Sequence, residues 1–219
     1  CISLNAVQRG FKVAMFSGEL MKEKVKTWLN QVAAGREFVK KVYGYDDLYY
    51  VPKDVTAKID RWTKDKVFLY DNKYGRNWSR LLESVKSVVE QKGVNLLILD
   101  NLMTLDLDSF SGDKNEKQSS FVNGLADLAK QANIHIILVA HPRKSLTFLR
   151  REDIGGSGDI TNLADNVYII HRCNKDFEKR APEFLGQDEV NKIIQYDGFS
   201  NVVEVCKNRF VGSVDNIFG

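Results

Sequence analysis

The feature that most constrains this chain is an apolar run, residues 94–99, that ends in an acid, Asp100. Such a run is typical of a strand buried on both faces in the middle of a sheet. In open α/β sheets, ligands bind at the carboxyl ends of the strands. A carboxylate there can hold Mg²⁺ beside a nucleotide's phosphates, directly or through water. The alternative is that Asp100 caps the following turn, and the run alone leaves both interpretations open.

Composition narrows the class of protein. The 219 residues are 43% hydrophobic, enough for one sizeable core, and the formal net charge of +3 is too small to indicate nucleic acid by itself. Cys1, Cys173 and Cys206 follow no metal or disulfide spacing, which indicates reduced thiols in an intracellular protein. No apolar run reaches membrane-spanning length and no signal peptide is visible.

Strand-like and helix-like segments alternate along the chain. Strands are predicted at 12–17, 67–70, 94–100, 134–140, 167–171, 190–196 and 202–207, and helices at 2–7, 19–34, 55–62, 78–89 and 121–129. This order predicts an α/β fold with a mostly parallel central sheet flanked by helices. The closer spacing of the later strands predicts antiparallel strands at the C-terminal edge. We see no repeat and no linker, so we expect a single domain over residues 1–219.

Two long polar stretches, 104–118 and 142–159, leave the ends of neighbouring predicted strands. Long loops inside a compact domain are uncommon and usually functional or disordered. A third stretch, 174–189, is rich in charge, and we expect it to be an exposed insertion.

Five short segments occur in a distinctive order: FSGE at 16–19, LLILD at 96–100, VAHPRK at 139–144, GSGDITNLADNVYIIHR at 156–172 and KNRFVG at 207–212. Their order and spacing resemble the RecA-like motor domain of hexameric replicative DNA helicases of the DnaB type. The phage primase-helicase and Twinkle type is the better match. The resemblance covers nearly the whole chain, and the last two segments are far more specific than a Walker B strand alone.

The resemblance implies a role for each of five residues. Glu19 would be the general base that polarises the attacking water, and Asp100 the Walker B acid that orients Mg²⁺. His141 would sense the γ-phosphate. Lys207 and Arg209 would reach the nucleotide of the neighbouring subunit, with Arg209 as the arginine finger.

Each of these residues also has a structural interpretation. Glu19 fits the first turn of a helix, where the macrodipole favours an acid. His141 could simply bond to backbone at a strand end. Lys207 and Arg209 could belong to a solvated edge strand, where cations are common.

The resemblance also implies cofactors and partners. The cofactors would be ATP, or another NTP, and Mg²⁺. In a hexameric ring, Arg143, Lys144, Arg150 and Arg151 would follow the phosphates of single-stranded DNA. Gly156 and its neighbours would donate backbone N–H groups to phosphate. We therefore expect an NTP-hydrolysing helicase in the cytoplasm of a bacterial or phage-infected cell, with primase as a further partner and no membrane association.

One departure from the family qualifies this hypothesis. The chain has no G-x-x-x-x-G-K-[ST] loop, whose amides and lysine would cradle the phosphates. We expect the chain to be truncated at both ends and to begin just after that loop, although a degenerate loop is an alternative. Such a fragment would bind and hydrolyse nucleotide poorly. Two other functions remain open: a RecA-fold ATPase of recombination or helicase loading, and a non-hydrolysing DNA-binding or assembly module.

Overall fold

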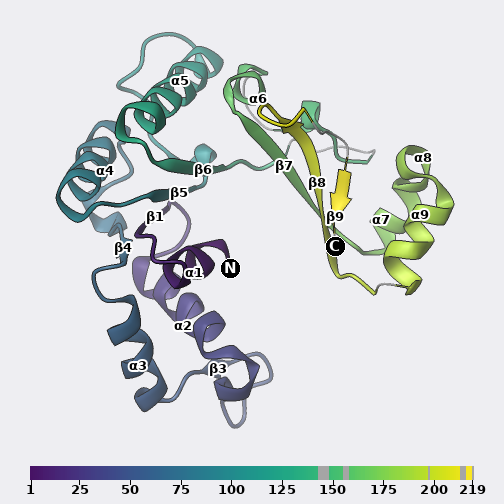
Figure 1. Ribbon diagram of the computed structural model, residues 1–219, viewed down its shortest axis with the longest axis horizontal. Coiled ribbons are helices and arrows are strands. Elements are labelled where there is room, and N and C mark those ends of the chain that lie inside the picture. The colour runs from purple at the N-terminus through teal and green to yellow at the C-terminus, as the bar shows by residue number, and fades with distance from the viewer. Residues whose placement is uncertain (143–147, 155–157, 197, 213–215, 219) are drawn as a thin grey trace. The chain divides into compact units, whose positions relative to one another are not determined.

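The computed structural model describes residues 1–142, 148–154, 158–196, 198–212 and 216–218 (Figure 1). The chain forms two compact units, and each is described by itself. The first comprises residues 1–111 and 127–140, and the second comprises residues 112–126 and 141–219. The expectation of one domain over residues 1–219 stays a prediction.

The first unit is built on a four-stranded parallel sheet, as predicted. Its strands are β1 (Val13–Ser17), β4 (Val67–Leu69), β5 (Leu96–Asp100) and β6 (His135–Val139), in the order β4-β1-β5-β6. Leu97 and Leu99 of β5 are at most 1% exposed, so the apolar run is a buried strand. The α/β prediction with a mostly parallel sheet is confirmed.

Helices connect these strands. They are α1 (Ile2–Gln8), α2 (Lys22–Phe38), α3 (Lys53–Thr63), α4 (Trp78–Lys92) and α5 (Lys114–Ala132), whose residues divide between the two units. Short elements are the 3₁₀ turns η1 (Asn72–Tyr74) and η2 (Leu102–Thr104), and the hairpin strands β2 (Lys40–Lys41) and β3 (Tyr49–Tyr50). Helices α2 and α3 pack side by side (Figure 1). None of the helices in the described part of the chain is long and apolar enough to span a membrane.

Local sequence explains where α4 begins and ends. The Asn77 side chain accepts a hydrogen bond from the Arg80 N–H at the first turn. Gly93 ends the helix in the left-handed conformation, with φ of 67°, which glycine adopts without steric cost. Trp78, Leu81 and Val85 are buried along one face, which is the 3.6-residue period read from the sequence.

Helix α5 begins earlier than predicted, so the 104–118 stretch is not one continuous loop. The Asp113 carboxylate accepts hydrogen bonds from the N–H groups of Asn115 and Glu116, and the Glu116 carboxylate accepts from the Asp113 N–H. This reciprocal capping starts the helix at Lys114. The D-x-x-E spacing was visible in the sequence, but its polar surroundings hid it.

The second unit contains an antiparallel sheet, β7-β8-β9, made of β7 (Asn166–Arg172), β8 (Asn201–Asn208) and β9 (Asn216–Phe218). The predicted antiparallel strands near the C-terminus are therefore confirmed. The remaining elements are η3 (Arg151–Asp153), α6 (Asp159–Leu163), α7 (Lys175–Arg180), α8 (Pro182–Leu185), α9 (Gln187–Asn191) and the π-helix η4 (Lys192–Tyr196).

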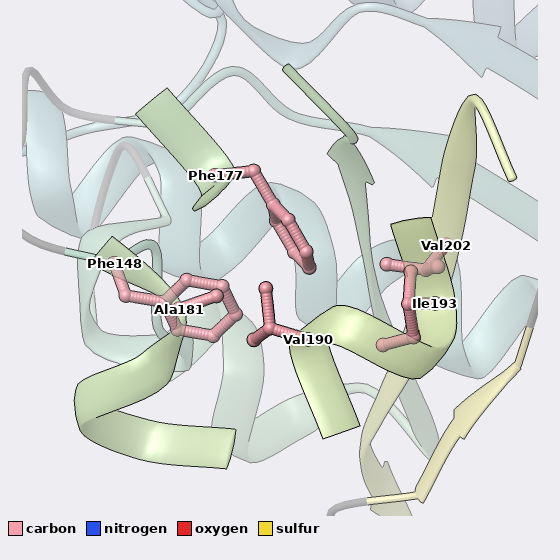
Figure 2. Close-up of a cluster of buried hydrophobic side chains, with 6 residues drawn as sticks. All are labelled: Phe148, Phe177, Ala181, Val190, Ile193 and Val202. Atoms are coloured by element: carbon pink, nitrogen blue, oxygen red, sulfur yellow. The ribbon is translucent and has the colours of Figure 1, made fainter. Parts of the chain in front are cut away.

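The predicted strand at 190–196 is wrong, because these residues form the end of α9 and the π-helix η4. Val190 and Ile193, three residues apart, both enter a core cluster with Phe177, Ala181 and Val202 (Figure 2). A helix places residues three apart on one face, whereas a strand would place them on opposite faces. Phe177 and Ala181 are buried, so the expectation of an exposed insertion at 174–189 is wrong as well.

Candidate functional site

The first unit brings polar residues together where its central strands end. Ser17 is the register partner of Asp100, and the Gly18 N–H donates to the Asp100 carbonyl at 2.6 Å. From β1 the chain continues to β4 on one side, and from β5 it continues to β6 on the other. The connections therefore diverge between β1 and β5, and such a switch point is where open α/β sheets bind ligands.

Glu19 lies at this switch point, two residues beyond β1. Its Oε1 accepts a hydrogen bond from Asn101 Nδ2 at 2.7 Å, and Asn101 directly follows Asp100. The first-turn interpretation of Glu19 does not hold, because α2 begins at Lys22 and its first-turn acid is Glu23. Glu19 and Asp100 therefore leave neighbouring strands with their side chains on adjoining loops.

The residue that caps the turn after β5 is Asn101. Its Oδ1 accepts from the Met103 N–H at 2.9 Å, at the start of η2, and the residue is fully buried. Thr104 Oγ1 donates to the Asn101 carbonyl at 2.8 Å. This leaves the simple capping interpretation of Asp100 without support, because its neighbour does that work.

The Glu19 loop is also held from the side of β4. Asn72 Nδ2 donates to the carbonyls of Ser17 and Leu20, at 2.5 and 2.9 Å. Gly18 packs so closely on Thr104 that a Cβ there would overlap the threonine hydroxyl. The loop thus has little room to move away from β5.

An ion-pair cluster lies beside Asn72. The buried carboxylate of Asp71 accepts a hydrogen bond from Lys22, the first residue of α2, and pairs with Lys73 at 3.0 Å. The Lys22 hydrogen bond, against the effect of burial and with help from Lys73, lowers the pKa of Asp71 to about 2. Asp71 is therefore ionised at neutral pH.

The donor set at the switch point fits Mg²⁺ in a nucleotide site. Asp100 and Glu19 offer carboxylate oxygens, the hard ligands that this ion prefers. Among the described residues there is no group of three or more His, Cys, Asp or Glu side chains that could hold a metal alone. Mg²⁺ at phosphates needs only one or two carboxylates, because waters and phosphate oxygens complete its shell.

His141 follows β6, whose last residue, Val139, is the register partner of Asp100. His141 itself is exposed and belongs to the second unit. Its role at the γ-phosphate stays a prediction.

Lys207 and Arg209 act together in the second unit. Lys207 Nζ donates to the carbonyls of Thr161 and Asn162, at 3.0 and 2.7 Å, at the end of α6. Arg209 Nη2 donates to the same Asn162 carbonyl at 3.2 Å, and its Nη1 pairs with Asp165 at 2.7 Å. Burial, with the charges of Arg209 and Arg151, lowers the pKa of Lys207.

The basic loop residues differ in their surroundings. Arg150 Nη1 pairs with the buried Glu204 at 3.2 Å, whereas the exposed Arg151 contacts only the equally exposed Glu152 among the ion pairs of the described residues, at 3.7 Å. Arg143, Lys144 and Gly156 lie outside the described residues. Arg151 is therefore the better placed of the two described arginines for a ligand.

Three functional-looking groups escaped the sequence reasoning. Asn72 and Asn101 resemble ordinary turn residues, and only the folded chain shows what they contact. The pair of His171 and Glu204, 2.7 Å apart, joins residues 33 positions apart. Phe148 stacks on His171 with ring centroids 4.3 Å apart and is 3% exposed, so it anchors its loop rather than offering a surface for a base.

Comparison with known proteins identifies the family. A model of the AAA domain family matches residues 3–146. Among solved structures, an isolated ATPase domain matches with a TM-score of 0.67 and 14% identity, over 98% of this chain and 72% of that one. A DnaB-like replicative helicase, solved to describe its interactions with primase, matches with a TM-score of 0.67 and 14% identity, over 97% of this chain and 48% of that one. The chain therefore belongs to the AAA domain family and has the RecA-like fold of DnaB-like replicative helicase motor domains.

Proposed function

We propose that this chain is the NTP-hydrolysing motor of a replicative DNA helicase, which moves on single-stranded DNA and unwinds duplex by hydrolysis at subunit interfaces. One observation carries the proposal. Glu19 and Asp100 leave neighbouring strands at the switch point of the sheet, with Glu19 held by the residue that follows Asp100.

This arrangement suits phosphoryl transfer to water. The reaction needs positioning and charge neutralisation more than covalent catalysis. Glu19 polarises the attacking water, and Asp100 orients Mg²⁺, as a Walker B acid does. When bound, the ion would neutralise charge on the β- and γ-phosphates. His141 senses the γ-phosphate.

Lys207 and Arg209 supply positive charge to the nucleotide of the neighbouring subunit in a hexameric ring. An arginine finger is worth roughly 10³–10⁵ in rate, or about 4–7 kcal/mol. In the structure, Arg209 is about half exposed and pairs with Asp165, itself about half exposed. Exchanging such an exposed ion pair for a phosphate costs little, because surface pairs contribute only about 0–1 kcal/mol.

The DNA would run along the basic loop. Arg151, Arg143 and Lys144 contact phosphates, the backbone around Gly156 donates N–H groups, and Arg150 shapes the loop through Glu204 or contacts phosphate itself. Primase is a further partner of the assembled ring, which works in the cytoplasm.

The test uses the full-length protein that carries this domain. Glu19→Gln should abolish DNA-stimulated ATP hydrolysis while ATP still binds, because the amide cannot accept a proton. Arg209→Ala should also abolish hydrolysis without loss of binding. Arg172→Ala, an exposed arginine at the other end of β7, is the matched control and should hydrolyse normally.

Mixing the two inactive proteins separates a shared site from a site within one subunit. A Glu19→Gln subunit still provides a finger, and an Arg209→Ala subunit still provides a base. Mixed rings should therefore regain part of the turnover. Failure of the mixture to regain any turnover would contradict a site shared between subunits, and full activity of Glu19→Gln would contradict hydrolysis at this site.

A further inference from the structure

We propose that Asn101 is a positioning residue that holds Glu19 in its ionised, water-facing state, and that Asn72 fixes the backbone of the same loop. The inference rests on the proposed hydrolytic function and deepens it. Its main contact is the 2.7 Å hydrogen bond from Asn101 Nδ2 to Glu19 Oε1, between residues 82 positions apart.

The orientation of the Asn101 amide is determined by its other contacts. Its Oδ1 accepts from the Met103 N–H at 2.9 Å, so the oxygen must face η2. The NH₂ group then has to face Glu19, because the two ends of an amide differ in donor and acceptor character. Full burial of Asn101 leaves no room for another rotamer.

This contact has a direct chemical consequence. A hydrogen bond donated to a carboxylate favours its ionised form. A general base must be ionised to accept a proton, and it must point at the water. A buried donor on Oε1 supplies both conditions from a rigid turn next to Asp100.

Asn72 acts on the backbone instead. Its Nδ2 donates to the carbonyls of Ser17 and Leu20, one on each side of Glu19. Those bonds fix the loop without touching the carboxylate. The two asparagines therefore make different predictions: losing Asn101 changes the charge state of Glu19, and losing Asn72 changes only its position.

The decisive variant is Asn101→Asp in the full-length protein. Aspartate has nearly the same shape and keeps the acceptor for Met103, but it replaces the donor to Glu19 with a like charge. We expect kcat for ATP hydrolysis to fall roughly 10- to 100-fold at neutral pH, with KM changed less than about twofold. The acidic limb of the kcat–pH profile should move to higher pH.

Asn72→Ala provides an independent measurement. It should lower kcat several-fold and leave the acidic limb where it is. Asn174→Asp is the matched control, because Asn174 caps α7 with the same Oδ1 geometry in the second unit. Its kcat and pH profile should stay unchanged, and thermal unfolding verifies that each variant is folded.

The outcomes separate this inference from the proposed function. A folded Asn101→Asp protein with wild-type kcat and pH profile overturns the inference, provided Glu19→Gln is inactive. If Asn101→Asp does not fold, Asn101→Ser takes its place, and an unmoved acidic limb in that variant overturns the inference equally. An active Glu19→Gln protein overturns the proposed function instead.

Discussion

Replacing Glu204 with glutamine should loosen the sheet of the second unit. Glu204 lies on β8 and is 2% exposed. Its Oε2 lies 2.7 Å from His171 Nε2 on β7, and its Oε1 accepts from Arg150 Nη1 at 3.2 Å. Glutamine keeps the shape, but its NH₂ group must face one of these two partners, so one hydrogen bond to a charged group is lost.

The magnitude follows from the surroundings of each partner. A hydrogen bond to a charged group contributes roughly 1.5–3 kcal/mol. The Arg150 side chain is 37% exposed, so water can hydrate the guanidinium once its partner is gone. We therefore expect a loss at the low end, about 1–2 kcal/mol, which corresponds to amide exchange about 5- to 30-fold faster.

Hydrogen-exchange mass spectrometry measures this loss locally. Peptides from β7 and β8 should exchange faster at pH 7, while peptides from α4 in the first unit should be unaffected. Unchanged exchange in β7 and β8 would refute the reasoning. All three tryptophans, Trp28, Trp62 and Trp78, lie in the first unit, so their fluorescence serves as the internal control.

The effect should also depend on pH in one direction. Burial alone would raise the pKa of Glu204, but the hydrogen bond from His171 and the charge of Arg150 outweigh it and lower the pKa. A group whose pKa is lowered on folding stabilises the protein above its unfolded value, and this contribution disappears as the pH falls through the folded value. The difference between wild type and Glu204→Gln in urea unfolding should thus persist from pH 7 to about 4.5 and close below that. A difference that grows on acidification would contradict the sign.

Two further substitutions test the loops of the first unit. Asp71→Asn should lower the melting temperature at pH 7, because the folded protein holds the pKa of Asp71 at about 2, and the difference should close as the pH falls from about 4 to about 2; a constant difference across this range would argue against the ion pair. Gly18→Ala should destabilise by roughly 1–3 kcal/mol in denaturant unfolding, because the new Cβ overlaps Thr104, whereas Gly124→Ala, with open space at its Cβ, should not destabilise; equal effects of the two would refute the close approach.

Local sequence determined much of the fold. The buried run ending at Asp100 predicted a central strand, and Gly93 predicted the end of a helix, because burial and backbone preference depend mainly on neighbouring residues. The order of strands and helices predicted a parallel sheet. The positions of Glu19 and Asp100 at strand ends were visible for the same reason.

Local sequence could not determine the contacts that complete the site or the second core. The apolar residues at 190–196 fit either a strand or a helix, and the partners Phe177 and Ala181 decided for the helix. Nothing near Asn101 in the sequence identifies Glu19 as its partner. Strand order brings those two side chains together across 82 residues, because neighbouring parallel strands place their carboxyl ends at one edge, and only the folded sheet shows which strands are neighbours.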